Sequence, residues 1–271
     1  MAPVGQVVAV VNQKGGVGKS TVTLGLASAA AQAGHKVLVV DADPQGATTH
    51  VLGLDVERLR ATLPDALGST RAGSAAAGIQ QSTWTHLIDV VPAGPKLQQL
   101  EAHRSGIDGF LFGDGADRLR RSLSGVTRGY GVVLVDCPPS LGALTTSALV
   151  AADQALIVVE PAALSLRGVG PVADLIDGVW ERHGRRLDLA GVVVNRVPAR
   201  GHDAEARYDE LARSVGAKSV WQPSVPQRVV LAEAASARRP IHGFGSRGRD
   251  VAEVFDQLYA QLWKRIRPRR R

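Results

Sequence analysis

A glycine-rich segment between two apolar segments is the feature that most limits how this chain can fold. Gln6–Val11 reads QVVAVV, residues 12–21 read NQKGGVGKST, and the Ala/Leu-rich run Ser20–Ala33 stops at Gly34. A β-branched run, a glycine loop and a helical pattern in this order predict a strand, a tight turn and a helix. Glycines let backbone N–H groups turn inward, and the helix adds the positive end of its dipole. The segment therefore predicts a phosphate-binding loop.

Four further apolar runs predict strands, and helical patterns separate them. The strands are expected at Lys36–Val40, Gly131–Val135, Ala155–Val159 and Leu189–Asn195. The helices are expected at Leu141–Ala152, Ser165–His183, Asp203–Val215 and Gly248–Ile266. Because the apolar runs alternate little with polar residues, both faces of the strands should be buried. The pattern predicts an α/β fold, with a predominantly parallel twisted β-sheet flanked by helices on both faces.

The size and composition of the chain favour one domain. Its 271 residues are near the upper limit for a single hydrophobic core, so we expect one domain over residues 1–271. Leu63–Gln81, rich in Ala, Gly and Ser, predicts a surface loop, and KRIRPRRR (Lys264–Arg271) predicts a disordered basic tail. The N-terminal segment lacks the pattern of a secretory signal, and no run of about 18 apolar residues indicates a membrane span. Cys137, the only cysteine, predicts a packed small residue and suits a reducing cytoplasm.

Positive charge is concentrated in the C-terminal third of the chain. The formal net charge is +7 overall, but residues 182–271 carry 19 basic and 9 acidic residues, a net of +10. Residues 1–181 carry 13 basic and 16 acidic residues, a net of −3. This asymmetry favours a polyanion as the partner of the C-terminal third. The alternative is an arginine-rich composition without such a partner, since 26 of the 32 basic residues are arginine.

Carboxylates follow two of the predicted strands and should lie near the glycine loop. DADPQG (Asp41–Gly46) follows the second strand, and DCPPS (Asp136–Ser140) follows the strand Gly131–Val135. In open α/β sheets, ligands bind outside the carboxyl ends of the strands. We therefore expect the loop and both carboxylate segments to converge at one edge of the sheet.

The motif predicts a role for each polar residue type in this site. Lys19 should reach the β- and γ-phosphates, and Ser20 should give its hydroxyl to Mg²⁺. Asp136 ends an apolar strand, as does the acidic residue that holds Mg²⁺ in phosphate-loop NTPases. Asp43 is placed to orient an attacking water. For Asp41 two interpretations remain open, a helix cap or an indirect contact with Mg²⁺.

Several motifs resemble the ParA/MinD group of phosphate-loop ATPases, and most closely its ParA branch. They are NQKGGVGKST (12–21), VLVVDADPQG (37–46), VVLVDCPPSLG (132–142) and, more loosely, PQRVVLAEAASARRPI (226–241), followed by a long C-terminal helix. Together these motifs span nearly the whole chain. The resemblance implies an ATPase that uses ATP and Mg²⁺ and forms a nucleotide-sandwich homodimer. It also implies slow hydrolysis that a partner stimulates.

The resemblance implies roles for individual residues as well. Lys14, the first of the two loop lysines, would reach across the dimer interface to the ATP phosphates of the other subunit and stabilise charge on the γ-phosphate. Asp43 would direct hydrolysis. Asn195 would read the adenine edge, and a structural asparagine ending a strand is an equally good interpretation. The nucleotide contacts of the loop would come from Gly15, Gly16, Val17, Gly18, Lys19, Ser20 and Thr21.

Relatives of the ParA type bind DNA without sequence preference through basic residues late in the chain, and the net charge of +10 there agrees with this. There is one departure, because the usual arginine shortly before the L-x-E-A element is Val230 here, with Arg228 two residues earlier. The resemblance further implies a cytoplasmic, nucleoid-associated protein with a ParB-like or cargo-adaptor partner. The candidate DNA-binding residues are Arg196, Arg200, Arg228, Arg238, Arg239, Arg247 and Arg249.

The C-terminal helix supports a second hypothesis. Its apolar face is formed by Val254, Phe255, Leu258, Leu262 and Ile266, with arginines beyond. MinD relatives end in a basic amphipathic helix that binds membrane, so the chain also resembles a membrane-surface ATPase that regulates division or polarity. The same stripe is expected of a helix that packs on the core, which is the interpretation that we favour. A third hypothesis keeps the fold but replaces DNA binding with nucleotide-gated protein binding.

Overall fold

The structure is a computed structural model, and it describes residues 5–102, 115–161, 166–183, 187–198, 208 and 211–266. Of the predicted helix Asp203–Val215, only residue 208 and residues 211–215 lie within these ranges, and both parts are helical.

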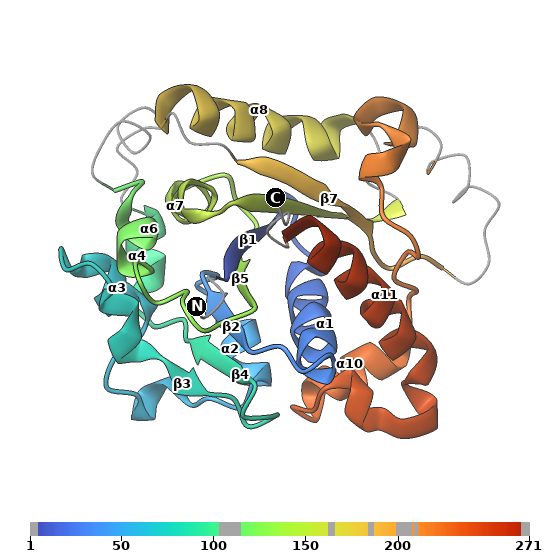
Figure 1. Cartoon of the computed structure of the whole chain (residues 1–271), viewed down its shortest axis with the longest axis horizontal. Helices are drawn as coiled ribbons and strands as arrows, with labels where there is room; N and C mark the ends of the chain where they lie inside the picture. Colours follow the sequence, from blue (N-terminus) through green and yellow to red (C-terminus); the bar gives the residue numbers. More distant parts are fainter. Residues whose placement is uncertain are drawn as a thin grey trace.

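Seven strands form one sheet within the described ranges, in the order β3-β4-β2-β5-β1-β6-β7 (Figure 1). Every neighbouring pair is parallel except β3 with β4. The predicted, predominantly parallel α/β fold is therefore confirmed. The strands are β1 Gln6–Val11, β2 Val37–Asp41, β3 Gln80–Gln81, β4 Ile88–Val91, β5 Val132–Asp136, β6 Gln154–Val159 and β7 Asp188–Val194.

Helices cover both faces of the sheet, as predicted. Successive side chains of a strand point to opposite faces, so Val8 of β1 packs with one set of helices and Val7 with the other. In Figure 1, α8 and α11 lie on opposite sides of β7. One layer contains α3 Leu63–Gly68, α4 Leu97–Ala102, α6 Arg118–Ser122, α7 Ala143–Ala151 and α8 Leu166–His183. The other contains α1 Lys19–Gln32, α2 Ala47–Val51, α10 Val229–Ser236 and α11 Arg249–Ile266.

The segment 63–81 is ordered secondary structure, so its prediction as a surface loop is wrong. It contains α3, a 3₁₀ turn at Ser74–Gly78 and the edge strand β3. Asp65 Oδ2 accepts a hydrogen bond from the backbone N of Thr62 at 2.9 Å, which fixes the start of α3. Leu63 is fully buried, with other apolar side chains of α3 beside it in the core. Burial of these side chains overrides the weak structural signal of the Ala, Gly and Ser residues around them.

Helix α11 packs on the core, as favoured from the sequence. Phe255, Leu258 and Leu262 are fully buried and belong to the same hydrophobic cluster as α1. The helix continues through Lys264 to the buried Ile266, so the expected disordered tail does not begin at Lys264. Residues 267–271 lie outside the described ranges. Among the described residues, no helix combines the length and the apolar character needed to cross a membrane.

Candidate phosphate-binding site

The loop between β1 and α1 has the backbone conformation that its glycines predict. Gly16 and Gly18 adopt positive φ angles of 80° and 87°, a region that favours glycine. A Cβ at Gly18 would lie 2.1 Å from Nδ2 of Asn195, so a larger residue there would have to displace the Asn195 amide in addition to adopting a strained φ. Gly18 precedes the first residue of α1, Lys19, and has no side chain to cap the helix. The loop thus directs the N-terminus of α1 toward any group that the glycines enclose.

Lys19 is held inside this site. Only 6% of it is exposed, and its Nζ donates to the backbone O of Lys14 at 3.4 Å. Burial lowers the pKa of Lys19, while the negative charges of Asp136 and Asp43 oppose that change. The ammonium group therefore lies among carboxylates at the carboxyl end of the sheet, as the motif predicts for a phosphate-binding lysine.

Two aspartates are adjacent at this edge of the sheet. Asp41 of β2 and Asp136 of β5 are register partners on neighbouring strands, and both are fully buried. Burial raises the pKa of Asp136 to about 6, and the side chains of Thr48 and Ser20, which hydrogen-bond to its carboxylate, act in the opposite direction. Burial and the nearby charge of Asp136 raise the pKa of Asp41 to about 7. The convergence of the loop with both carboxylate segments is as the sequence predicts.

The contacts of the two carboxylates differ. Asp136 accepts from Ser20 of the glycine loop and from Thr48 Oγ1 at 2.6 Å, so a hydroxyl and a carboxylate suited to Mg²⁺ lie together. Asp41 Oδ2 accepts from the backbone N and Oγ1 of Thr49, both at 2.7 Å, and its Oδ1 accepts from the backbone N of Asp43 at 3.2 Å. Oδ2 of Asp41 thus binds an amide in α2, as a cap would, while Oδ1 binds the preceding loop. Asp41 also lies beside Asp136, so the cap and the indirect contact with Mg²⁺ both remain open.

Asp43 lies in the loop between β2 and α2. It is partly exposed, and its Oδ1 accepts from the backbone N of Gln45 at 2.9 Å. Its negative charge acts to raise the pKa of Lys19, so the two charged groups lie near each other. This position at the mouth of the site is compatible with the predicted orientation of a water.

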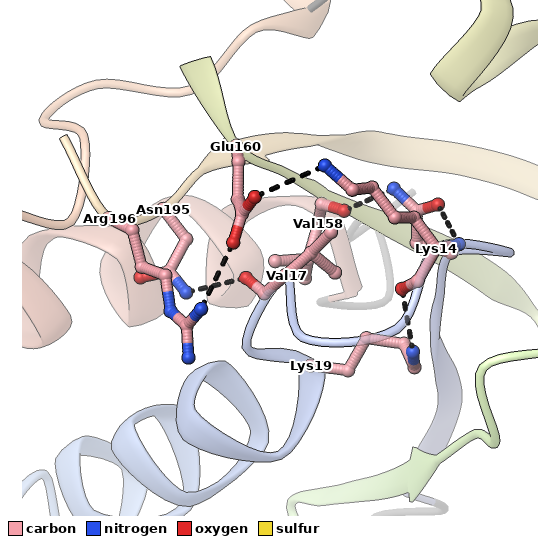
Figure 2. Close-up of polar contacts among 8 residues, drawn as sticks. Lys14, Val17, Lys19, Val158, Glu160, Asn195 and Arg196 are labelled. Carbon is pink, nitrogen blue, oxygen red and sulfur yellow. Dashed lines mark hydrogen bonds and ion pairs between the residues drawn. The ribbon is translucent and has the colours of Figure 1, made fainter. Parts of the chain in front are cut away.

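Lys14 is held on the outer side of the loop by an acidic residue that the sequence analysis missed (Figure 2). Its Nζ lies 3.4 Å from Oε2 of Glu160, and Oε1 of the same glutamate lies 3.1 Å from Nη1 of Arg196. The backbone N of Lys14 donates to Asn12 Oδ1, and Asn12 Nδ2 donates to Val158 O. Glu160 directly follows β6, so the rule that identified the aspartates at the carboxyl edge would also have found it.

Asn195 fastens the glycine loop to the end of β7. Its Nδ2 donates to the backbone O of Val17 at 2.7 Å, and only 1% of the residue is exposed. Within the described part of the chain, its buried Oδ1 has no hydrogen-bond partner. The structural interpretation is therefore supported, and the adenine contact of Asn195 stays a prediction.

Most candidate DNA-binding arginines that the structure describes are engaged within the chain. Arg239 donates to Gly243 O at 2.8 Å, and Arg249 is an exposed residue at the start of α11. Arg200 lies outside the described residues. The remaining arginines and their partners are Arg196 with Glu160, Arg228 with Asp250, Arg238 with His50, and Arg247 with Glu233.

The fold and the site place this chain in the class of phosphate-loop NTPases. Residues 5–189 match the AAA_31 family, described as an AAA domain. The chain is 33% identical to the chromosome partitioning protein ParA of Myxococcus xanthus, covering 99% of this chain and 91% of that protein. It is 32% identical to the sporulation initiation inhibitor protein Soj of Bacillus subtilis, covering 95% and 98%. The chain belongs to the ParA/Soj family of partitioning ATPases.

Solved structures agree with this fold. A cobyrinic acid a,c-diamide synthase of Mycobacterium smegmatis, crystallised with an ATP analogue and magnesium, is 29% identical with a TM-score of 0.76 and coverage of 97% and 98%. The ATP complex of a Cyanothece McdA variant has a TM-score of 0.83 at 19% identity, with 99% of both chains covered. At that identity the likeness to McdA concerns the fold alone.

Proposed function

We propose that this chain is an ATP- and Mg²⁺-dependent ATPase that closes into a sandwich homodimer, binds DNA without sequence preference and drives segregation or positioning of DNA or another cargo. Membership of the ParA/Soj family supports ATP hydrolysis as the activity. Hydrolysis is slow until a partner, a ParB-like protein or a cargo adaptor, stimulates it. The protein works in the cytoplasm on the nucleoid surface.

One observation carries the dimer proposal: the two loop lysines have opposite environments. Lys19 is 6% exposed and turned into its own site, whereas the side chain of Lys14 is 50% exposed on the outer side of the loop. One buried lysine serves the phosphates of its own subunit. An exposed lysine beside the same loop binds the phosphates of a facing subunit. There its positive charge offsets the repulsion between the two triphosphates.

The metal and the nucleotide have residues suited to them. Ser20 and Asp136, which hydrogen-bond to each other, would hold Mg²⁺ with oxygen ligands. When bound, the ion neutralises charge on the phosphates. Asp41 supports this site indirectly, because it accepts hydrogen bonds from Thr49 of α2. Asp43 orients the attacking water. Asn195 would accept from the adenine amine through Oδ1, since its Nδ2 is already engaged by Val17.

DNA binding is assigned to the arginines between Arg228 and Arg249. The Arg228–Asp250 pair, at 2.9 Å, joins two side chains that are each about half exposed. Surface ion pairs of this kind are worth only about 0–1 kcal/mol, so exchanging Asp250 for a DNA phosphate costs little. Each exchange releases counterions from DNA, and affinity should therefore fall steeply with salt.

Co-sedimentation with DNA and with liposomes, each with and without Mg²⁺-ATP, tests this function. We expect ATP-dependent retention on DNA that is lost at high salt, and no retention on liposomes. The burial of the apolar face of α11 disfavours the membrane-surface alternative, because that face is already occupied by the core. Retention on liposomes would support that alternative, and binding to neither would leave nucleotide-gated protein binding.

A further inference from the structure

Helix α2 is attached to the nucleotide site through two buried threonines. Thr48 donates to Asp136 and Thr49 to Asp41, through the short hydrogen bonds given above. Thr49 Oγ1 also accepts from the backbone N of Ala93 at 2.9 Å, just beyond β4. Because these groups are buried and fully engaged, a displacement of either carboxylate changes the position that α2 prefers.

The last turn of the same helix contacts the arginine-bearing segment. Nη2 of Arg238 lies 3.0 Å from both ring nitrogens of His50. Trp84 forms a second bridge, because its Nε1 lies within hydrogen-bond distance of two carbonyl oxygens, Val51 O of α2 at 3.1 Å and Arg238 O at 3.0 Å. A short chain of contacts therefore connects the aspartates of the nucleotide site with residue 238.

Arg238 is the point at which the chain leaves α10 and turns toward the next 3₁₀ turn, Ile241–Arg247. Its φ is 51°, a left-handed conformation that few non-glycine residues adopt. Its backbone N donates to Ala235 O, and the N of Arg239 donates to Ala234 O, so these bonds close the end of α10. A contact that holds residue 238 thus fixes the direction in which the candidate DNA-binding segment continues.

The packing around this junction leaves room for movement. A pocket of about 40 Å³, partly open to solvent, lies between α1, α2, α10 and α11, and Val51, Trp84, Leu231, Ala235 and Arg239 contribute to its lining. Just beyond the end of α10, the polar contacts of Arg238 with His50 and Trp84 hold the chain in addition to packing.

We propose that α2 links the nucleotide site to the arginine-bearing segment 228–249, with His50 and Trp84 as the positioning residues at its far end. The link rests on the proposed nucleotide-dependent binding of DNA. Occupancy of the site by Mg²⁺ and phosphates moves Asp136 and Thr48, α2 follows, and its contacts with Arg238 reposition α10 and the arginines. The nucleotide thereby controls the surface without touching it.

Hydrogen–deuterium exchange of the full chain, with and without a non-hydrolysable ATP analogue and Mg²⁺, tests this link. In the wild type we expect the analogue to change exchange at least threefold across residues 228–248 as well as in the glycine loop. In the double variant His50→Ala/Trp84→Phe, we expect the loop to respond as before, analogue affinity to stay within about threefold, and the response of 228–248 to disappear. Trp180→Phe, at the exposed tryptophan of α8, is the matched control and should behave as the wild type.

The outcomes separate the link from the function on which it depends. An unchanged response of residues 228–248 in the double variant would overturn the link, as would a wild type in which only the glycine loop responds. If the wild type bound no analogue at all, the proposed function itself would fall, and the link with it. Each single variant, His50→Ala and Trp84→Phe, should retain part of the response, which guards against misfolding of the double variant.

Discussion

Nζ of Lys14 and Oε2 of Glu160 lie 3.4 Å apart on the outer face of the glycine loop, and the same carboxylate binds Arg196 (Figure 2). The lysine that we assign to the facing subunit is thus paired within its own subunit. In the proposed sandwich dimer this pair would have to open in both subunits, so Glu160 would compete with the facing triphosphate for Lys14.

Glu160→Gln should strengthen ATP-dependent dimerisation. A surface ion pair contributes about 0.5 kcal/mol, and two pairs open in each dimer, so we expect a fewfold lower dimer dissociation constant. Sedimentation velocity across a concentration series with Mg²⁺ and a non-hydrolysable analogue measures it. Asp250→Asn, which removes a surface carboxylate paired with Arg228, is the control and should leave dimerisation unchanged. A weaker dimer in Glu160→Gln would show that the glutamate supports the interface.

Asp43→Ala should trap the ATP-bound dimer. The substitution removes a partly exposed carboxylate that we propose orients the water, and it leaves Lys19 and the buried aspartates in place. We expect hydrolysis to fall by about 10²-fold or more, the range of general-base contributions, with nucleotide affinity retained. Phosphate release under single-turnover conditions measures the chemical step. Normal hydrolysis by this variant would remove Asp43 from the mechanism.

Gly25→Ala should destabilise the packing of α11 against α1. A Cβ at Gly25 would lie 2.3 Å from the ring of Phe255, which is fully buried. Overpacking of this kind costs about 1–3 kcal/mol. Urea denaturation measures the free energy of unfolding of this variant and of a control, Gly178→Ala in α8. At Gly178 an added Cβ meets nothing within 4 Å, so the higher helix propensity of alanine should raise stability by about 0.5–1 kcal/mol. Equal stabilities of the two variants would contradict the packed position of α11.

Asp41→Asn should change how stability depends on pH. The pKa of Asp41 rises from an ordinary 3.8 to about 7 in the folded chain, so between these values the folded state holds a proton that the unfolded state releases. Stability is therefore lost as pH rises through this window, by at most about 1.4 kcal/mol per pH unit. We expect the free energy of unfolding of the wild type, relative to the variant, to fall between pH 4.5 and 7.

Chemical denaturation in EDTA without nucleotide measures this difference, because bound metal would alter the carboxylates. Parallel pH profiles of the wild type and Asp41→Asn would show that Asp41 is ionised throughout. That result would show that burial and the neighbouring Asp136 do not raise the pKa of Asp41 in the folded chain.

The strands around the nucleotide site follow from the sequence because their apolar runs are long, whereas their order in the sheet comes from the structure alone. β4, Ile88–Val91, is not predicted because its sequence, IDVV, is short and contains the polar residue Asp89 at its second position. α3 is not predicted either, because its helical signal is local and its stability comes from burying Leu63. These elements depend on tertiary contacts that a single sequence does not display.

The candidate site divides in the same way. Lys19 and Ser20 are predictable because the motif dictates their spacing, and Asp136 is predictable because it ends an apolar strand. The carboxyl-edge rule would place Glu160 near the site, but not its pairing with Lys14, which depends on the pairing of β1 with β6. The contact of Thr49 with Asp41 likewise depends on the position of α2. The arginines show most clearly what a sequence cannot predict. Net charge predicts a basic surface, but it does not predict the partner that each guanidinium has within the chain.

The association state of Lys14→Ala tests the central claim most directly. Sedimentation velocity with Mg²⁺ and a non-hydrolysable ATP analogue should show a dimer for the wild type and a monomer for Lys14→Ala, with nucleotide affinity of the monomer largely retained. Lys19→Ala should bind no nucleotide and serves as the control for an empty site. A Lys14→Ala protein that dimerises with the analogue as the wild type does would contradict the account.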